Sequence, residues 1–322
     1  MTLHTNKELF EKAIKETADN LGIKDYFIEK DYWISLILKR LSESKYVYFV
    51  VFKGGTSLSK GHKLIKRFSE DVNMAVIINH GTSGNQIKTM IRTLEKEITC
   101  DLNEIEVKGL TSKGSRFRKA IYQYPKTLKQ KQNIAVSNSI IVEINSFANP
   151  FPYSKMGIQS MIGEYLQSNK QTELIQKYGL EAFDVNVLHK EQTLIEKLVS
   201  LVRFSFSSNP VESISGKIRH FYDLYYLLND KDCLDYVNSE DFKIQFKEIL
   251  THEKQQFDEP AAWNEKTIQE SPLIKDFDVL WNKLKITYTK ELSMLAYSEI
   301  PKEDEVAESF KKLIAILASI KE

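Results

Sequence analysis

The stretch KGGTSLSKGHKLIKRFSEDVNMAV, residues 53–76, decides the fold of the first half of the chain. It follows YVYFVVF, residues 46–52, whose aromatic and β-branched side chains predict a buried strand. Two adjacent glycines and a Thr-Ser pair then predict a turn into a short helix. DVNMAVII, residues 71–78, predicts another strand. The stretch therefore predicts two strands joined through a glycine turn and a short helix.

Asp71 and Asn73 place two polar side chains at the start of the second of these strands. Residues two apart on a strand point to the same face, so the two side chains project side by side. Paired carboxylates in this arrangement can hold hard cations such as Mg²⁺, and two metals about 4 Å apart can clamp a nucleotidyl transfer. Glu143 in IIVEINSF is the candidate third carboxylate, because a charge among apolar strand residues is costly unless it is paired or metal-bound. A solvated strand-end aspartate and an edge-strand glutamate also explain the pattern.

Gly54 and Gly55 allow backbone N–H groups to approach a phosphate closely. Thr56 and Ser57 add hydroxyl donors and could begin a helix whose N-terminus favours anions. The Walker A pattern G-x-x-x-x-G-K-[ST] is absent. A tight turn without a ligand is the alternative interpretation of this short motif.

The remaining sequence divides into two halves of different character. In the first half, helical spacing of apolar residues covers 6–19, 27–41 and 85–98, and strands are predicted at 104–108, 115–124 and 139–147. NPFP, residues 149–152, ends the last strand. In the second half we predict a short strand at 183–187 and helices over 192–206, 215–228, 239–253, 274–293 and 303–320. An α/β first half is thus predicted to join a helical second half within residues 150–190.

The composition predicts a folded chain without a strong overall charge. Of the 322 residues, 42% are apolar and 28% are charged, and the net charge is +1. Any nucleic-acid contact must therefore come from a local patch. Cys100 and Cys233 are the only cysteines, which favours a reducing compartment without disulfides. The charged N-terminus lacks a signal core and no apolar run is long enough for a bilayer, so we expect a cytoplasmic protein without a membrane partner.

Several motifs together resemble the AbiEii/AbiGii-type toxins, which are nucleotidyltransferases of toxin–antitoxin and phage-defence systems. The resemblance rests on FKGGTSLSKGHKLIKRFSED before a strand, on IEKDYWISLIL at residues 28–38, and on the later segments TLIEKLVSLVRF and KIRHFYDLYYLL. These motifs occur in the family's order over residues 27–228. The resemblance implies an α+β fold. Residues 1–188 would form a polymerase-β-like nucleotidyltransferase core, which is a mixed sheet with flanking helices. Residues 189–322 would form a helical bundle domain.

The resemblance also implies the residues of the site. Nucleotide phosphates would be bound by the glycine loop and by the serine of SED, at Gly54, Gly55, Thr56, Ser57 and Ser69. Metal ligands fall at Asp71 and, in a looser alignment, at Glu143, while Asn73 occupies the position of the family's second aspartate. Family members also use a lysine and an aspartate from two helices of the second half, and these are Lys197 and Asp223 here. Asp71, Asn73, Lys197 and Asp223 are therefore the candidate catalytic residues.

The helical spacing around Lys197 supports a polar role for it without proving one. The apolar residues of this helix share one face: Leu194, Ile195, Leu198, Val199, Leu201 and Val202. Lys197 lies on the other face, where it could reach a triphosphate or simply contact solvent. Arg219 and Asp223 are four residues apart on a predicted helix, so a surface ion pair is an alternative explanation for Asp223.

A basic segment lies between residues 107 and 142. It contains no acidic residue and eight basic ones: Lys108, Lys113, Arg116, Arg118, Lys119, Lys126, Lys129 and Lys131. Phe117, Tyr122 and Tyr124 are interleaved, so the segment could follow an RNA backbone while its rings stack on bases. The resemblance favours RNA, because some family members modify the 3′ end of tRNA. The candidate RNA-binding residues are Lys113, Arg116, Arg118 and Lys119, and a solvent-exposed charged hairpin is the alternative.

Asn73 decides whether this chain is expected to be active. It offers Mg²⁺ a neutral oxygen in place of a charged one, which weakens metal binding and activates the attacking hydroxyl less. The natural protein could carry Asn and work weakly, it could be a non-catalytic relative, or the chain could be a deliberately inactivated copy.

The leading hypothesis is an Mg²⁺-dependent toxin with a cognate antitoxin that transfers a nucleoside monophosphate from an NTP to RNA, above all tRNA. The alternatives are a non-catalytic module that binds nucleotide, RNA or a partner protein, and transfer onto a protein hydroxyl.

Overall fold

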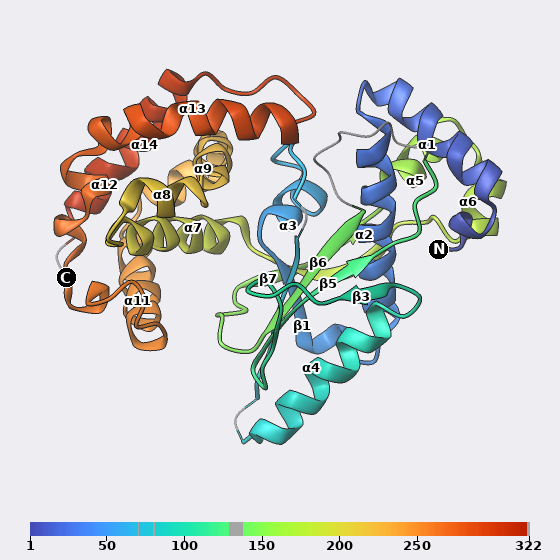
Figure 1. Cartoon of the computed structure of the whole chain (residues 1–322), viewed down its shortest axis with the longest axis horizontal. Helices are drawn as coiled ribbons and strands as arrows, with labels where there is room; N and C mark the ends of the chain where they lie inside the picture. The colour runs from blue at the N-terminus through green and yellow to red at the C-terminus, as the bar shows by residue number, and fades with distance from the viewer. Residues whose placement is uncertain (70, 80, 129–137, 321–322) are drawn as a thin grey trace. The chain divides into compact units, whose positions relative to one another are not determined.

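A computed structural model describes residues 1–69, 71–79, 81–128 and 138–320. The chain forms two compact units, whose elements are labelled in Figure 1. The first unit consists of Met1–Lys63 and Phe68–His189, and the second of Leu64–Arg67 and Lys190–Glu322. The short segment Leu64–Arg67 thus belongs to the second unit, although the chain on both sides of it belongs to the first.

A mixed sheet forms the centre of the first unit. Its strands follow the order β3-β5-β6-β2-β1-β8-β7, and β4 pairs with β5. β2 is parallel to β6 and β1 is parallel to β8, while the other neighbours are antiparallel. The strands are β1 (Val50–Lys53), β2 (Asp71–Val76), β3 (Asn103–Ile105), β4 (Ser112–Lys113), β5 (Phe117–Gln123), β6 (Ser139–Asn145), β7 (Tyr153–Ile158) and β8 (Phe183–Leu188). The α+β class and the mixed sheet expected from the sequence are confirmed.

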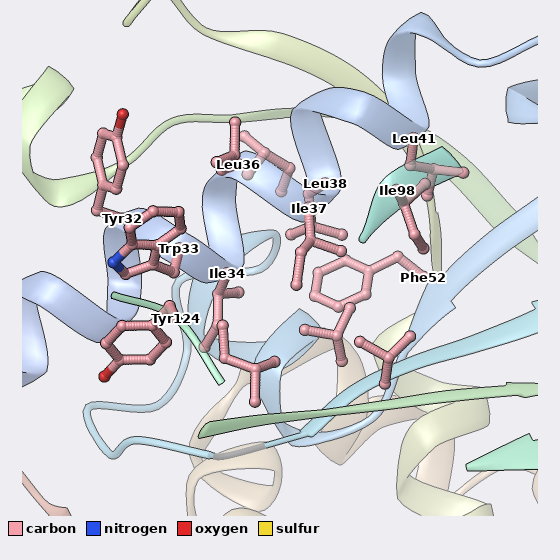
Figure 2. Close-up of a cluster of buried hydrophobic side chains, with 14 of the residues drawn as sticks. Tyr32, Trp33, Ile34, Leu36, Ile37, Leu38, Leu41, Phe52, Ile98 and Tyr124 are labelled. Atoms are coloured by element: carbon pink, nitrogen blue, oxygen red, sulfur yellow. The ribbon is translucent and has the colours of Figure 1, made fainter. Parts of the chain in front are cut away.

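Helices pack against one face of this sheet. They are α1 (Lys7–Leu21), α2 (Asp25–Glu43), α4 (Gly84–Ile98), α5 (Met161–Ser168) and α6 (Thr172–Tyr178), with the short α3 (Gly55–Lys60) after β1. Ile34 and Ile37 of α2 join Phe52 of β1 and Ile98 of α4 in the buried core (Figure 2). Each such side chain contributes about 2 kcal/mol when it is fully buried, so α2 is fixed firmly against the sheet.

The two faces of the sheet differ in burial. On β6, Val142 belongs to this core, whereas Glu143 is half buried. On β2, Val72 belongs to the core, whereas Asp71 and Asn73 are half buried. Because side chains alternate along a strand, Asp71, Asn73 and Glu143 share the face opposite the helical core.

The second unit is helical, as the sequence predicts. Its helices are α7 (Lys190–Ser205), α8 (Pro210–Ser215), α9 (Arg219–Asn229), α10 (Lys231–Val237), α11 (Glu240–Gln256), α12 (Pro272–Lys275), α13 (Phe277–Leu295) and α14 (Glu303–Ala318). Rings of Phe221, Phe277, Trp281 and Phe310 meet in its core and join α9, α13 and α14. Within the described part of the chain, no helix combines the length and the apolar character needed to cross a membrane.

Two local predictions differ from the structure. The strand predicted at residues 46–52 begins only at Val50, because Val47–Phe49 form a 3₁₀ turn with Tyr48 69% exposed. The sequence also did not predict β7, whose segment YSKMGI shows no alternation of apolar and polar residues. β7 lies at the end of the strand order, where pairing with β8 stabilises a segment of weak strand propensity.

Candidate active site

A glycine turn connects β1 to α3 at one end of the candidate site. Gly54 has a φ of 83°, a left-handed conformation that favours glycine. A Cβ atom built on Gly54 would also lie 2.9 Å from Nδ2 of Asn73. Backbone conformation and packing therefore both require glycine here, and the turn lies directly against the Asn73 side chain.

The hydroxyl groups that follow the turn are both used inside the first unit. Thr56 donates a hydrogen bond to the backbone oxygen of Asp71, and Ser57 donates one to the backbone oxygen of Gly54 at 2.8 Å. Both side chains are buried. Thr56 thereby ties the turn to β2, and both hydroxyl donors are used within the first unit.

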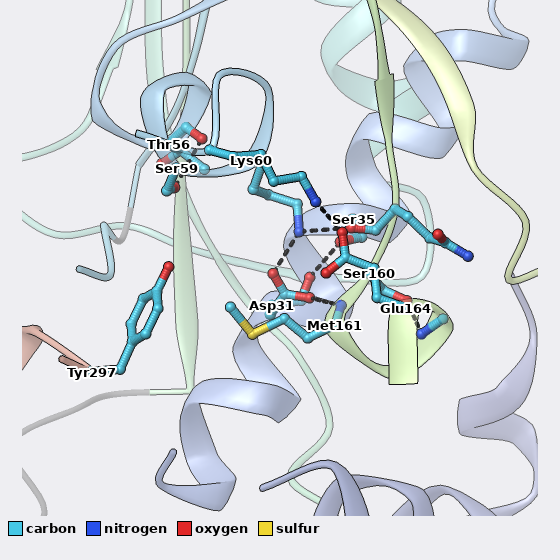
Figure 3. A network of polar contacts seen from close by, with 12 residues as sticks. Asp31, Ser35, Thr56, Ser59, Lys60, Ser160, Met161, Glu164 and Tyr297 are labelled. Carbon is cyan, nitrogen blue, oxygen red and sulfur yellow. Dashed lines mark hydrogen bonds and ion pairs between the residues drawn. The ribbon is translucent and has the colours of Figure 1, made fainter. Parts of the chain in front are cut away.

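The far end of α3 is held by a buried ion pair. Lys60 donates to one carboxylate oxygen of Asp31 on α2, and the other oxygen accepts the backbone N–H of Met161, the first residue of α5, at 2.7 Å (Figure 3). Lys60 also donates to the backbone oxygen of Gln159 at 3.2 Å. One carboxylate therefore links α2 to α3 and α5. Asp31 belongs to the EKDYW motif, whose role was not apparent from the sequence.

The structure brings Asp71, Asn73 and Glu143 together on the half-buried face of the sheet. β2 and β6 are parallel, and Asn73 is the register partner of Glu143. Asp71 precedes Asn73 by two residues and projects from the same face. The glutamate expected from a neighbouring strand thus lies beside the Asp71 and Asn73 pair, with Gly54 in contact with Asn73.

Two lysines extend this row across the sheet. Lys53 on β1 is the register partner of Asn73, and Lys119 on β5 is the register partner of Glu143. Nζ of Lys119 lies 3.8 Å from Oε2 of Glu143. The row therefore crosses four neighbouring strands, with a lysine at each end. This arrangement depends on strand order, so sequence spacing did not reveal it.

Lys197 and Asp223 meet in the interior of the second unit. Nζ of Lys197 on α7 is 2.7 Å from Oδ2 of Asp223 on α9. Arg67 binds the same carboxylate, with Nε 2.7 Å from Oδ1 and Nη2 2.6 Å from Oδ2. The exposed fractions of the Lys197, Asp223 and Arg67 side chains are 7%, 0% and 3%. The two residues implied by the resemblance are therefore in contact, together with an arginine that the sequence did not single out.

Burial and charge shift the ionisation of this cluster. Burial raises the pKa of Asp223, but the charges of Arg67 and Lys197 outweigh burial and hold that pKa below its ordinary value. Burial lowers the pKa of Lys197, Asp223 opposes this shift, and Arg67 reinforces it. Burial and the Lys197 charge lower the pKa of His220 well below its ordinary value, so its imidazole is neutral at pH 7.

The surface interpretations of Lys197 and Asp223 are wrong. Lys197 does not lie on a solvated helix face, and Thr193 one turn before it is buried as well. Asp223 pairs inside the cluster and not with Arg219, whose Nε lies 3.7 Å from Oε1 of Glu291. Other helices of the unit pack around α7, and this tertiary effect is not visible in the spacing of a single helix.

The match to known families covers most of the chain. A family model described as the nucleotidyl transferase AbiEii toxin of type IV toxin–antitoxin systems matches residues 36–314. The chain belongs to the AbiEii nucleotidyltransferase toxin family. No curated protein matches its sequence. Among solved structures it is similar to MenT4, a nucleotidyltransferase toxin from Mycobacterium tuberculosis H37Rv, with 12% identity and a TM-score of 0.45 over 98% of this chain and 99% of that chain.

Membership of the AbiEii family gives these two groups of residues a chemical context. A nucleotidyltransferase takes a nucleotide as substrate, and a toxin of a toxin–antitoxin system has a cognate antitoxin. The matched region includes the glycine turn, β2 and β6 in the first unit and α7 and α9 in the second. Both candidate groups therefore lie within the part of the chain that the AbiEii family shares.

The donors on the sheet face suit a hard divalent cation in kind, but they offer it less charge than paired aspartates do. Asp71 and Glu143 provide carboxylate oxygens and Asn73 provides an amide oxygen, and such oxygens are the ligands that Mg²⁺ prefers. Lys119 already pairs with Glu143. Among the residues that the structure describes, no group of three or more His, Cys, Asp or Glu side chains is placed to hold a metal ion. The amide oxygen of Asn73 offers a cation less charge than the carboxylate of an aspartate at this position would.

Three of the four candidate RNA-binding residues of this AbiEii protein, Lys113, Arg118 and Lys119, form ion pairs. Nζ of Lys113 lies 2.9 Å from a carboxylate oxygen on β3, and Arg118 pairs with the buried Glu95 of α4. Lys119 lies in the row on the sheet face. Arg116 is exposed, so it is the candidate in this segment best placed to meet a phosphate backbone.

The prediction that the interleaved rings stack on bases is wrong for two of them. Tyr122 and Tyr124 are buried, and Tyr124 stacks on Trp33 with ring centroids 5.5 Å apart (Figure 2). Their side chains pack into the helical core and cannot reach a nucleotide. Lys129 and Lys131 of the same segment lie outside the described residues.

Proposed function

We propose that this protein transfers a nucleoside monophosphate from an NTP to an RNA acceptor, and that the acceptor is the 3′ end of a tRNA. The main support is the placement of Asp71, Asn73 and Glu143 on one sheet face beside the Gly54 turn, in a member of the AbiEii family. Because the turn contacts Asn73, a phosphate bound by the turn would lie next to these oxygen donors. We place the reaction, and the cognate antitoxin, in the cytoplasm.

The reaction joins the terminal ribose of the acceptor to the nucleotide. The ribose hydroxyl oxygen attacks the α-phosphorus of the NTP, the bond from that phosphorus to the oxygen bridging to the β-phosphate breaks, pyrophosphate leaves, and the hydroxyl proton is lost to solvent. A bound divalent cation, which we propose to be Mg²⁺, supplies positive charge to the transferring phosphate. The residues that would hold it are Asp71, Asn73 and Glu143.

The remaining candidate residues bind or position the substrate. Backbone N–H groups of Gly55, Thr56 and Ser57 would contact phosphate oxygens. Ser69 is buried beside β2 and stays a candidate for the same task. We assign the triphosphate to Lys197 and a positioning role to Asp223, because Asp223 is fully buried and holds Lys197.

A non-catalytic nucleotide- or RNA-binding role is the second candidate. Asn73 supplies no charge, and Nζ of Lys119 lies 3.8 Å from the Glu143 carboxylate, so these residues offer a cation less negative charge than three carboxylates would. Under this alternative, RNA binding persists and weakens with salt, while no nucleotide is transferred.

The experiment that separates the two functions restores the charge at position 73. The unaltered chain, the Asn73→Asp variant and the Asp71→Asn/Asn73→Asp double variant are incubated with total RNA, Mg²⁺ and each of the four radiolabelled NTPs. We expect labelled tRNA with Asn73→Asp, little label with the unaltered chain, and none with the double variant, which has the same total charge as the unaltered chain.

One result would overturn the proposed transfer. It is an Asn73→Asp variant that is folded and binds Mg²⁺, yet labels neither RNA nor protein with any NTP. Label on a protein hydroxyl without label on RNA would show that the protein is a transferase whose acceptor is a protein and not RNA. To test whether the 3′ end is the acceptor, label incorporation is compared between intact tRNA and tRNA whose 3′ end has been oxidised with periodate. Oxidised tRNA should take up no label.

A further inference from the structure

Three basic side chains follow one another along the outer face of α4. Lys88, Arg92 and Lys96 are four residues apart, so they occupy successive turns of one helix face, about 6 Å apart along the helix axis. All three side chains are exposed, and α4 lies at the outside of the first unit (Figure 1). These three residues are called the α4 stripe below.

The α4 stripe keeps its positive charge. No acidic side chain among the residues that the structure describes forms an ion pair with it. Glu95 of the same helix is buried and pairs with Arg118 of β5. Glu97 is exposed, but it lies about 140° around the helix axis from Arg92. The stripe therefore presents three cationic groups to solvent.

Like charges at this spacing oppose helix formation, because side chains four residues apart repel each other across one turn. α1 of the same unit has the opposite arrangement. There, Nζ of Lys12 lies 3.7 Å from Oε1 of Glu16, and Nζ of Lys15 lies 2.6 Å from Oε1 of Glu11. The α4 stripe thus lowers the stability of its own helix, and a bound polyanion would relieve the repulsion.

The surroundings of the stripe suit a nucleic-acid backbone better than a lipid surface. Asn85, Thr89 and Thr93 are exposed on the same outer face, and such side chains bond to phosphate oxygens together with Lys and Arg. The structure describes the whole of α4, and this helix exposes no large apolar side chain. A helix that binds in a membrane interface buries an apolar face. Phosphates repeat along a nucleic-acid strand, so evenly spaced cations can bind several of them.

β5 separates the stripe from the candidate active site by the thickness of the sheet. Arg118 points from β5 toward α4, where it pairs with Glu95, and the next residue, Lys119, points to the opposite face beside Glu143. β3 and β4 are the strands that follow β5 at this margin of the sheet. A polynucleotide whose end occupies the sheet face can therefore pass round this margin to reach α4.

We propose that the α4 stripe binds the phosphate backbone of the RNA acceptor, away from the nucleotide that receives the transferred group. This inference rests on the proposed function, in which the 3′ end of the acceptor reaches the sheet face. Contacts to phosphate carry no sequence information, so the stripe holds the body of the RNA without selecting bases. Its contribution is affinity for RNA, and it takes no part in the chemical step.

The test measures the binding of a fluorescein-labelled tRNA mixture to the full chain by anisotropy, without NTP and over a series of salt concentrations. The Lys88→Gln/Arg92→Gln/Lys96→Gln variant should bind about tenfold or more weakly at low salt. Its slope of log affinity against log salt should be shallower by about 2–3, because each lost phosphate contact removes about 0.7–0.9 from the slope. Urea unfolding should show no loss of stability, because the repulsion along α4 is removed.

Matched variants separate the position of the charges from the net charge. Lys7→Gln/Lys12→Gln/Lys15→Gln removes three positive charges from exposed positions of α1 in the same unit and should change tRNA affinity by less than about twofold. Lys88→Arg/Lys96→Arg keeps the charge of the stripe and should keep the affinity. Circular dichroism confirms folding for each variant.

Three results overturn the inference. They are unchanged tRNA affinity in a folded stripe variant, an equal loss of affinity in the α1 variant, and loss of binding to phosphatidylserine vesicles, but not to tRNA, in the stripe variant. The proposed transfer is judged separately by label incorporation with Asn73→Asp. A chain that labels tRNA without using the stripe contradicts only the inference, and a chain that binds tRNA through the stripe without labelling it contradicts only the transfer.

Discussion

Replacing Asp223 by Asn should destabilise the helical unit strongly. The change removes the carboxylate that both Arg67 and Lys197 bind, and it leaves these two buried cations within hydrogen-bond distance of one amide. Breaking a buried ion pair by removing one partner typically costs about 3–5 kcal/mol, because the remaining charge is left uncompensated. We expect a loss in this range for the free energy of unfolding of the second unit.

The control is an ion pair on the surface of the same helix. Arg219 and Glu291 are both partly exposed, and their closest atoms are 3.7 Å apart. Exposed pairs contribute between zero and about 1 kcal/mol, so Arg219→Gln should change stability by less than about 1 kcal/mol. Each variant removes one charge from α9, so the difference between their losses of unfolding free energy reports the effect of burial.

Urea unfolding followed by tryptophan fluorescence provides the measurement. In a Trp33→Phe background, Trp263 and Trp281 report on the second unit, because Trp33 is the tryptophan of the first. Double variants with Arg67→Gln complete a thermodynamic cycle. The cycle should show coupling between Arg67 and Asp223, because either single change disrupts the two hydrogen bonds that join them.

The pH dependence follows from the lowered pKa of Asp223. A carboxyl whose pKa is lower in the folded than in the unfolded state stabilises the fold above its unfolded pKa of about 3.9, and this stabilisation is lost as the pH falls through the folded value. The unaltered second unit should therefore lose stability below about pH 4, and Asp223→Asn should lack this part of the slope. A loss below 1 kcal/mol for Asp223→Asn at pH 7, or an unchanged acid slope, would refute the buried-cluster reasoning.

The other predictions concern the first unit. Gly54→Ala should destabilise the first unit by about 1–3 kcal/mol, because φ at Gly54 is 83° and the new Cβ would lie 2.9 Å from Nδ2 of Asn73. Gly84→Ala is the control and should not destabilise the unit, because its Cβ would meet open space. Urea unfolding followed by Trp33 fluorescence measures both variants. Asp31→Asn should lower the free energy of unfolding of the first unit by about 3 kcal/mol or more in the same measurement, because Lys60 loses its buried partner. An unchanged urea midpoint would contradict this prediction. Asn73→Asp should bind Mn²⁺ about tenfold or more tightly in calorimetry, and equal affinity would show that this side chain is not a ligand.

Much of the local structure followed from local sequence. The glycine turn required Gly54, and the two-residue period of a strand placed Asp71 and Asn73 on one face. Most predicted helices appeared near their expected limits, because apolar spacing reflects burial directly. β7 escaped prediction because it depends on pairing with β8, which no property of its own segment encodes.

The sequence by itself thus determined the strand, turn, helix and strand around Asp71, and the ordered motifs that mark the AbiEii family. The tertiary structure alone decided that Lys119 lies beside Glu143, that Asp31 binds Lys60, and that Arg67 joins Lys197 and Asp223. The physical reason is the range of the interactions. Periodicity and turn chemistry act between near neighbours in the chain, whereas the balance of charge in a site depends on strand order and helix packing, which join residues far apart in sequence.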